Sequence, residues 1–250
     1  RLQAGDEVIV FEAGDGQRAQ SLLAEVELLT TQSQGLDRAR TVLVSGEVKS
    51  PGEYPLTRNM TVDQLLKISG DVTTDAAVKT IILAKRELGT DRLSFKMLDR
   101  NSDDANQMLS PRDELFILPA NDKRKKLLED VIAEAKAQSF YGSSIPIIKV
   151  SGAVRFPGTY PKLENGTLAD AINLAGGLKE EAYRLSGELT RMRVAEDEES
   201  FDVSHQVFSL LDSTEQGLGL PLWSRDKIVV MPIPEFGEVE TVELSGEVRF

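Results

Sequence analysis

One sequence feature, a segment that occurs three times, constrains this chain more than any other. Residues 41–55 read TVLVSGEVKSPGEYP and residues 147–161 read IIKVSGAVRFPGTYP, and the pattern starts again as TVELSGEVRF at residues 241–250. Each copy begins with a β-branched run that alternates with polar residues, which is typical of a half-buried strand. The two full copies continue into Pro-Gly, which favours a type II turn with φ > 0 at the glycine. Each copy therefore predicts a β-hairpin at the start of a repeated unit.

The two complete copies align well beyond the hairpin. Gly46 and Gly152 set an offset of 106 residues, and this offset holds through a predicted helix in each copy. Thr61 and Thr167 precede the two helices and can cap them through their hydroxyls. A glycine follows each helix, where a residue with φ > 0 is favoured. The residues expected to shape turns and caps are Gly46, Pro51, Gly52, Gly70, Gly152, Pro157, Gly158 and Gly176.

Later in each unit the two copies differ in length. Ser94-Phe95 still aligns with Ser200-Phe201 at the offset of 106, whereas Asp113 aligns with Asp226 at an offset of 113. The difference predicts a seven-residue insertion in the second unit, which we place near residues 212–219.

A second kind of helix is expected between the units, because apolar residues recur there at helical spacing. The third gap, from Asp226 to Gly246, has only 20 residues and is too short for this helix. The pattern predicts an α+β chain of tandem β-grasp domains, each with one helix on a small mixed sheet, joined by linking helices. The expected segments are the last strand of a preceding repeat (1–11), a linking helix (12–40), repeat 1 (41–119), a linking helix (120–146), repeat 2 (147–232), and a linker with the first strand of a following repeat (233–250). We accordingly expect the chain to be a fragment of a longer protein.

Composition excludes several classes of function. The net charge of −12 disfavours nonspecific nucleic-acid binding, which needs a basic surface. The chain has no cysteine and one histidine, His205, so it holds no disulfide, thiolate metal site or multi-histidine metal site. No apolar run is long enough for a transmembrane helix. We expect no cofactor.

The combined pattern resembles a known domain. Ser-Gly-x-Val-x-x-Pro-Gly-x-Tyr-Pro, followed by a Thr-capped helix ending in Gly and by a final strand after Leu-x-x-x-Asp, is similar to the soluble-ligand-binding β-grasp (SLBB) domain of bacterial polysaccharide-export proteins. Those proteins carry several such domains in tandem. The resemblance implies a periplasmic location, associated with the outer membrane, and a role in a ring through which capsule or exopolysaccharide is exported. It also implies self-association or contact with other export proteins, and contact with polysaccharide.

Basic residues recur at one position of the repeat. Lys49, Arg155 and Arg249 each follow a valine, so strand alternation turns them to the opposite face from that valine. Phe156 follows Arg155, and a cation beside an aromatic ring suits a sugar or a carboxylated polymer. The same charges also suit edge strands that must avoid aggregation.

A basic run, made up of Lys123, Arg124, Lys125 and Lys126, stands at the predicted start of the second linking helix. Positive charge at a helix N-terminus opposes the helix dipole, so another contact is expected to compensate. We consider an acidic neighbouring subunit as that contact, with a solvated helix end as the alternative.

No catalytic residues are predicted. The G-x-S-x-G pattern is absent, and the acidic runs at 103–104 and 196–199 lack the spacing of a calcium-binding loop. We therefore expect a non-enzymatic module of a polysaccharide-export protein. A stand-alone carbohydrate-binding module, or an accessory domain of an enzyme whose catalytic part lies elsewhere, remains the alternative.

Overall fold

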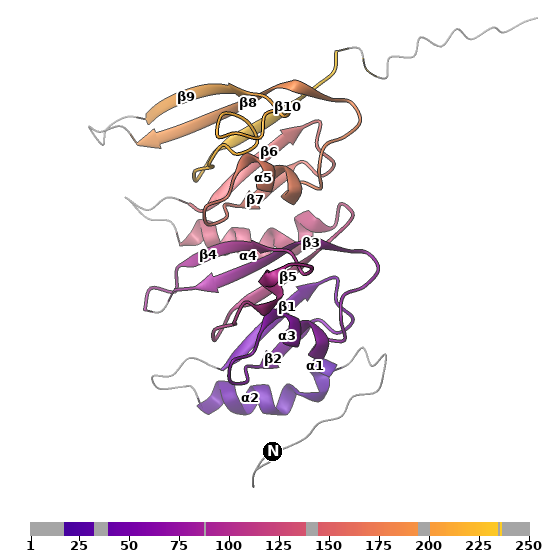
Figure 1. The fold of residues 1–250 in the computed structure, drawn as a ribbon. Helices are drawn as coiled ribbons and strands as arrows, with labels where there is room; N and C mark the ends of the chain where they lie inside the picture. Colours follow the sequence, from indigo (N-terminus) through magenta and orange to yellow (C-terminus); the bar gives the residue numbers. More distant parts are fainter. Residues whose placement is uncertain are drawn as a thin grey trace, which may run out of the picture.

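The computed structural model describes residues 18–32, 40–87, 89–138, 145–194, 201–234 and 236. Two β-grasp-like units, with helices packed on them, lie one after the other along the molecule (Figure 1). The predictions for residues 1–11, for residues 241–250 and for Arg249 concern residues outside these ranges. Among the described helices, none is long and apolar enough to cross a membrane.

Repeat 1 is one mixed sheet with a helix. Its elements are β1 (Thr41–Gly46), β2 (Gly52–Pro55), α3 (Val62–Ile68), β3 (Ala76–Arg86), β4 (Leu93–Leu98), a 3-10 turn (Asp103–Asn106) and β5 (Glu114–Pro119). The strand order is β2-β1-β5-β3-β4, with β1 and β5 parallel and the other neighbours antiparallel.

Repeat 2 has the same topology. Its elements are β6 (Ile147–Gly152), β7 (Gly158–Pro161), α5 (Leu168–Leu174), β8 (Ala182–Val194), β9 (Phe201–Phe208) and β10 (Lys227–Pro232). Its strand order, β7-β6-β10-β8-β9, repeats that of the first sheet, again with one parallel pair, β6 and β10. The α+β prediction of two small mixed sheets, each with one helix, is confirmed.

The predicted hairpins form, although Pro-Gly is not the tight turn that joins them. β1 pairs antiparallel with β2, and β6 with β7. Between β1 and β2 the chain runs beside the end of α3, where the Lys49 amide donates to the Asp71 carbonyl at 3.0 Å. Gly158 does not have the positive φ of a type II turn, so that prediction is wrong there. The connection between the two hairpin strands is shaped by its pairing with the residues that follow α3 or α5, and not by a local turn.

The glycine that the hairpins require is the one in Ser-Gly. Gly46 has φ +95° and Gly152 has φ +85°. A β-carbon on Gly152 would lie 2.0 Å from the carbonyl oxygen of Val230, and one on Gly46 would lie 2.1 Å from that of Ile117. The end of the first strand therefore approaches the last strand of its unit too closely for any side chain.

The helix boundaries follow the predicted caps. The Thr61 and Thr167 hydroxyls accept from the third backbone amide of α3 and α5, in capping boxes completed by the side chains of Gln64 and Asp170. Gly70, with φ +84°, ends α3 in a Schellman motif, and Gly176 does the same for α5.

Strand pairing corrects the position of the insertion. Leu98 pairs with Ile81 and Phe208 pairs with Gly187, so β4 and β9 correspond at an offset of 110 residues rather than 106. Ser94-Phe95 therefore does not correspond to Ser200-Phe201. Four of the seven extra residues lengthen β8 and β9 by two residues each relative to β3 and β4, and three lie between β9 and β10. The longer β8–β9 hairpin is the main difference between the repeats.

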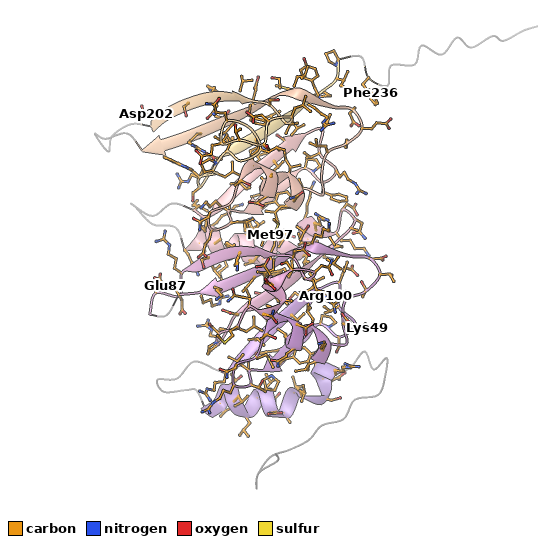
Figure 2. All side chains as sticks on the ribbon, in the orientation of Figure 1. Lys49, Glu87, Met97, Arg100, Asp202 and Phe236 are labelled. Carbon is orange, nitrogen blue, oxygen red and sulfur yellow. The ribbon has the colours of Figure 1, made fainter. Side chains whose placement is uncertain are left out.

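The helices outside the sheets are α1 (Arg18–Ser21), α2 (Leu23–Gln32) and α4 (Arg124–Ala137). Figure 1 shows α4 lying between the first sheet and the second unit. Buried residues of α4, such as Leu128 and Val131, share one apolar cluster with Phe95 of β4 and Tyr160 of β7. Met97, labelled in Figure 2, packs against the same cluster, which therefore joins the two repeats.

Replacing Gly152 by Ala is expected to lower the free energy of unfolding by about 3 kcal/mol or more, because a clash with Val230 adds to the strain of positive φ. Gly177 is the matched control: its φ is +90°, but nothing lies within 4 Å of an added β-carbon. Gly177→Ala should cost only about 1–2 kcal/mol. Urea unfolding of both variants checks this, and equal losses would contradict the close approach.

Candidate functional site

The repeated basic position lies on the surface. Val48 and Val154 are buried, whereas Lys49 and Arg155 are exposed, as strand alternation predicts. The Arg155 guanidinium carbon lies 5.5 Å from the centre of the Phe156 ring. Exposure makes both cations available to a ligand or to another protein.

Lys49 has a cationic neighbour, because both it and Arg100 bond to Asp71. The Lys49 amide donates to the Asp71 carbonyl, and the Arg100 guanidinium pairs with the Asp71 carboxylate. The hydrogen bond from Arg100 holds the pKa of this carboxyl below its usual value. Figure 2 shows Lys49 and Arg100 on the same side of repeat 1, opposite Glu87.

The basic run at the start of α4 is not one surface patch. Lys123, Lys125 and Lys126 are exposed, but Arg124 is buried, with 3% of its surface accessible. The Arg124 Nε donates to the Pro119 carbonyl at 2.6 Å, and its Nη1 donates to the Leu174 carbonyl at 2.8 Å. The Arg124 guanidinium is thus bonded within the chain and is not part of the candidate contact surface.

The same arrangement occurs in repeat 1 through a residue that the sequence analysis missed. The Arg18 Nη1 donates to the carbonyls of Lys67 and Ile68 at 3.1 and 3.3 Å, at the end of α3. Arg18 precedes Arg124 by the repeat offset of 106, which was the available signal. A guanidinium at a helix C-terminus meets the negative end of the dipole and satisfies carbonyls that have no partner within the helix.

The burial of Arg124 also indicates a structural role for Phe156. The Arg124 guanidinium carbon lies 4.9 Å from the centre of the Phe156 ring, so this ring has contacts with two cations, Arg124 and Arg155. Phe156 is partly buried and helps to seat Arg124 between α4 and α5. A structural role accounts for Phe156, whereas Arg155 remains exposed.

Arg124→Met keeps the apolar part of the side chain but leaves the Pro119 and Leu174 carbonyls without their donors. We expect the free energy of unfolding to fall by about 2–3 kcal/mol. Lys126→Met, on the exposed side of the same helix, should change it by less than about 0.5 kcal/mol. Urea denaturation measures both, and a neutral Arg124→Met would show that the buried hydrogen bonds contribute little.

A cleft of about 670 Å³ lies between the first sheet and α4. This volume is in the range of small-molecule sites. One wall is the face of β1 and β5 that is turned toward α4, and the other wall is a single face of α4. The lining residues are Leu43, Ser45, Gly46, Glu47, Glu114, Phe116, Pro119, Lys123, Lys126, Leu127, Asp130, Val131 and Glu134.

Charges in this cleft are separated along α4. Lys123 and Lys126 stand at its N-terminal end, beside the end of β5, whereas Asp130 stands at its middle and Glu134 in its last turn. Glu134 Oε2 accepts from Arg86 at 2.9 Å. Glu47 follows Gly46, which lies opposite Ile117 of β5, so Glu47 stands at the same end as the lysines, where it accepts from the Thr73 hydroxyl at 2.7 Å. The cleft thus has two lysines with Glu47 at one end, and Glu114, Asp130 and Glu134 toward the other.

Glu114 is the partly buried acid at this end of the cleft. Burial raises the pKa of Glu114 from 4.5 to about 7, and Glu134 and Asp130 add to this rise, while the Ser45 hydroxyl and Arg86 oppose it. The hydrogen bond from Ser45 Oγ to Glu114 Oε1 is long, at 3.3 Å. Near neutral pH this carboxyl can accept or release a proton.

Glu114 should make stability fall as pH rises. Its proton is held in the folded state up to a pKa of about 7 but released at 4.5 when solvated. The protonated Glu114 therefore contributes fully to the free energy of unfolding below pH 4.5, and this contribution is lost as the pH rises through about 7. Glu114→Gln is expected to raise the free energy of unfolding by about 2 kcal/mol at about pH 8, and by little at about pH 4. Exposed Glu188→Gln is the control, and a pH-independent difference for Glu114→Gln would contradict the shift.

The single histidine and the acidic side chains form no metal-ligating group among the described residues. His205 is exposed, and its Nδ1 lies 3.1 Å from the Thr190 hydroxyl. No group of three or more metal-ligating side chains occurs in the part of the chain that the structure describes.

Comparison with known protein families identifies the repeated unit. Residues 41–95 and residues 147–202 each match the SLBB domain, a soluble-ligand-binding β-grasp domain. The two matches begin at β1 and at β6, so they coincide with the starts of the two sheets.

Proposed function

We propose that this chain, with its two SLBB domains in tandem, is a non-enzymatic module of a periplasmic polysaccharide-export protein associated with the outer membrane. In this proposal it acts in ring assembly, in contact with the exported glycan, or in both. SLBB domains bind soluble ligands, which agrees with a binding module.

The observation that carries the proposal is the continuous core across α4. The apolar cluster runs from Phe95 in the first sheet through Leu128 to Tyr160 in the second unit. The Glu164 amide also donates to the Phe95 carbonyl at 2.7 Å, directly between the two units. Domains fixed in this way present their surfaces at a constant spacing, as a scaffold that lines or supports a passage must.

The alternative is a carbohydrate-binding module that captures polymer without assembling. The cleft beside α4 and the exposed Lys49 and Arg155 serve this function equally well. Self-association distinguishes the two. An assembly module must bind copies of itself or other export proteins, whereas a capture module can act as a monomer.

Sedimentation velocity over a wide range of protein concentration tests the assembly function. We expect the mass to rise with concentration, and we expect Lys49→Glu with Arg155→Glu to reduce the rise, because both residues are exposed cations. Glu188→Gln, another exposed change, should leave it unaltered. A chain that stays monomeric throughout would favour the capture function.

Export itself is tested in cells that carry the protein. Deletion of residues 18–232, which removes both units with their helices, should lower surface polysaccharide while total synthesis is maintained. The double charge reversal at Lys49 and Arg155 provides a second variant with an intact core. Normal surface polysaccharide in both strains would argue against any role in export.

A further inference from the structure

The acidic residues on the strands of the cleft beside α4 are not repeated at the corresponding strand positions of repeat 2. Strand β10 corresponds to β5 at an offset of 113 residues, so Lys227 occupies the position of Glu114. Ala153 likewise stands where repeat 1 has Glu47. The fold does not require an acid at the Glu114 position, and the acidic end of the cleft is a particular property of the junction.

The order of charges along α4 does not stabilise the helix. Lys123 and Lys126 lie at its positive end and Glu134 lies in its last turn, so these three oppose the dipole, whereas Asp130 lies at the middle of the helix. Arg124 at the same N-terminus is accounted for by its buried hydrogen bonds, but the two lysines are exposed. Glu134 is accounted for by its pair with Arg86. Lys123 and Lys126 therefore break this rule without a structural gain, which points to function.

The geometry defines what the cleft can accept. From Lys123 to Glu134 the helix rises by about 16 Å, which is longer than a single sugar ring. Between the charged ends, apolar side chains of Phe116, Leu127 and Val131 line the cleft. Phe116 and Val131 are almost fully buried and fix the base of the cleft. Leu43 is exposed and Leu127 partly buried, so these two offer apolar surface to a ligand.

The acidic end favours a cation. Glu114 and Asp130 line it, while Arg86 already pairs with Glu134. A ligand ammonium at Glu114 would replace the proton that burial holds on this carboxyl near neutral pH. At the other end, Lys123 and Lys126 favour a carboxylate or a phosphate.

We propose that the cleft between the first sheet and α4 binds an amphoteric saccharide segment, with an ammonium-bearing sugar against Glu114 and Asp130 and an acidic sugar against Lys123 and Lys126. This inference rests on the proposed contact with glycan and specifies its chemistry.

A matched pair of ligands tests the proposal by calorimetry at about pH 7. One is an alternating glucosamine–glucuronate tetrasaccharide with free amines, and the other is the same tetrasaccharide with every amine acetylated. We expect the wild-type chain to bind the free amine form at least about tenfold more tightly, the ratio that one charge-assisted hydrogen bond supports. Glu114→Gln should remove this preference.

Two further variants locate the binding. Lys123→Gln with Lys126→Gln should weaken both tetrasaccharides, because both carry the carboxylates. Lys227→Gln, at the corresponding position in repeat 2, should change neither affinity. A preference that survives in Glu114→Gln, or the absence of binding by either ligand, would overturn the proposal. Either result leaves the export function open, since that function is measured separately by surface polysaccharide in cells.

Discussion

The structure depends on a helix that is buried from two sides. A β-grasp unit of this size has a small core, and α4 supplies apolar surface both to the sheet before it and to the unit after it. Arg124 contributes to the same junction, because it bonds to the end of β5 and to the end of α5. If α4 separated from the first sheet, a face of that sheet that includes Phe95 and Phe116 would be exposed. The two units are therefore held together by shared core rather than by a flexible connection.

Much of the fold can be predicted from the sequence, because the repeat supplies an internal comparison. Strand starts, the Thr61 and Thr167 caps and the glycines after the helices occur at one offset, and each has a local physical cause. The position of the insertion cannot be predicted this way. Ser94-Phe95 and Ser200-Phe201 look equivalent in sequence, but strand pairing decides equivalence, and pairing is a non-local property.

The candidate site was less predictable, for a related reason. Four adjacent basic residues look alike in sequence, yet Arg124 is buried because carbonyls from β5 and α5 converge on it, while its neighbours remain exposed. Glu114 gives no signal by itself. Its raised pKa arises mainly from burial in the folded chain, and Glu134 and Asp130 of α4 add smaller contributions. Repeats that share a fold can thus differ in the chemistry of one position, as Glu114 and Lys227 do.

The arginines at the helix ends also bear on how such an array grows in evolution. Arg18 and Arg124 each reach forward to the helix of the unit that follows them. A gene segment that is duplicated or transplanted as a self-sufficient piece would therefore begin at the arginine-bearing helix, upstream of the hairpin where the family match begins. A piece that begins at the hairpin would lack the arginine that bonds to the carbonyls at the end of its helix. The piece that carries its own arginine therefore begins one helix before the domain that the family match covers.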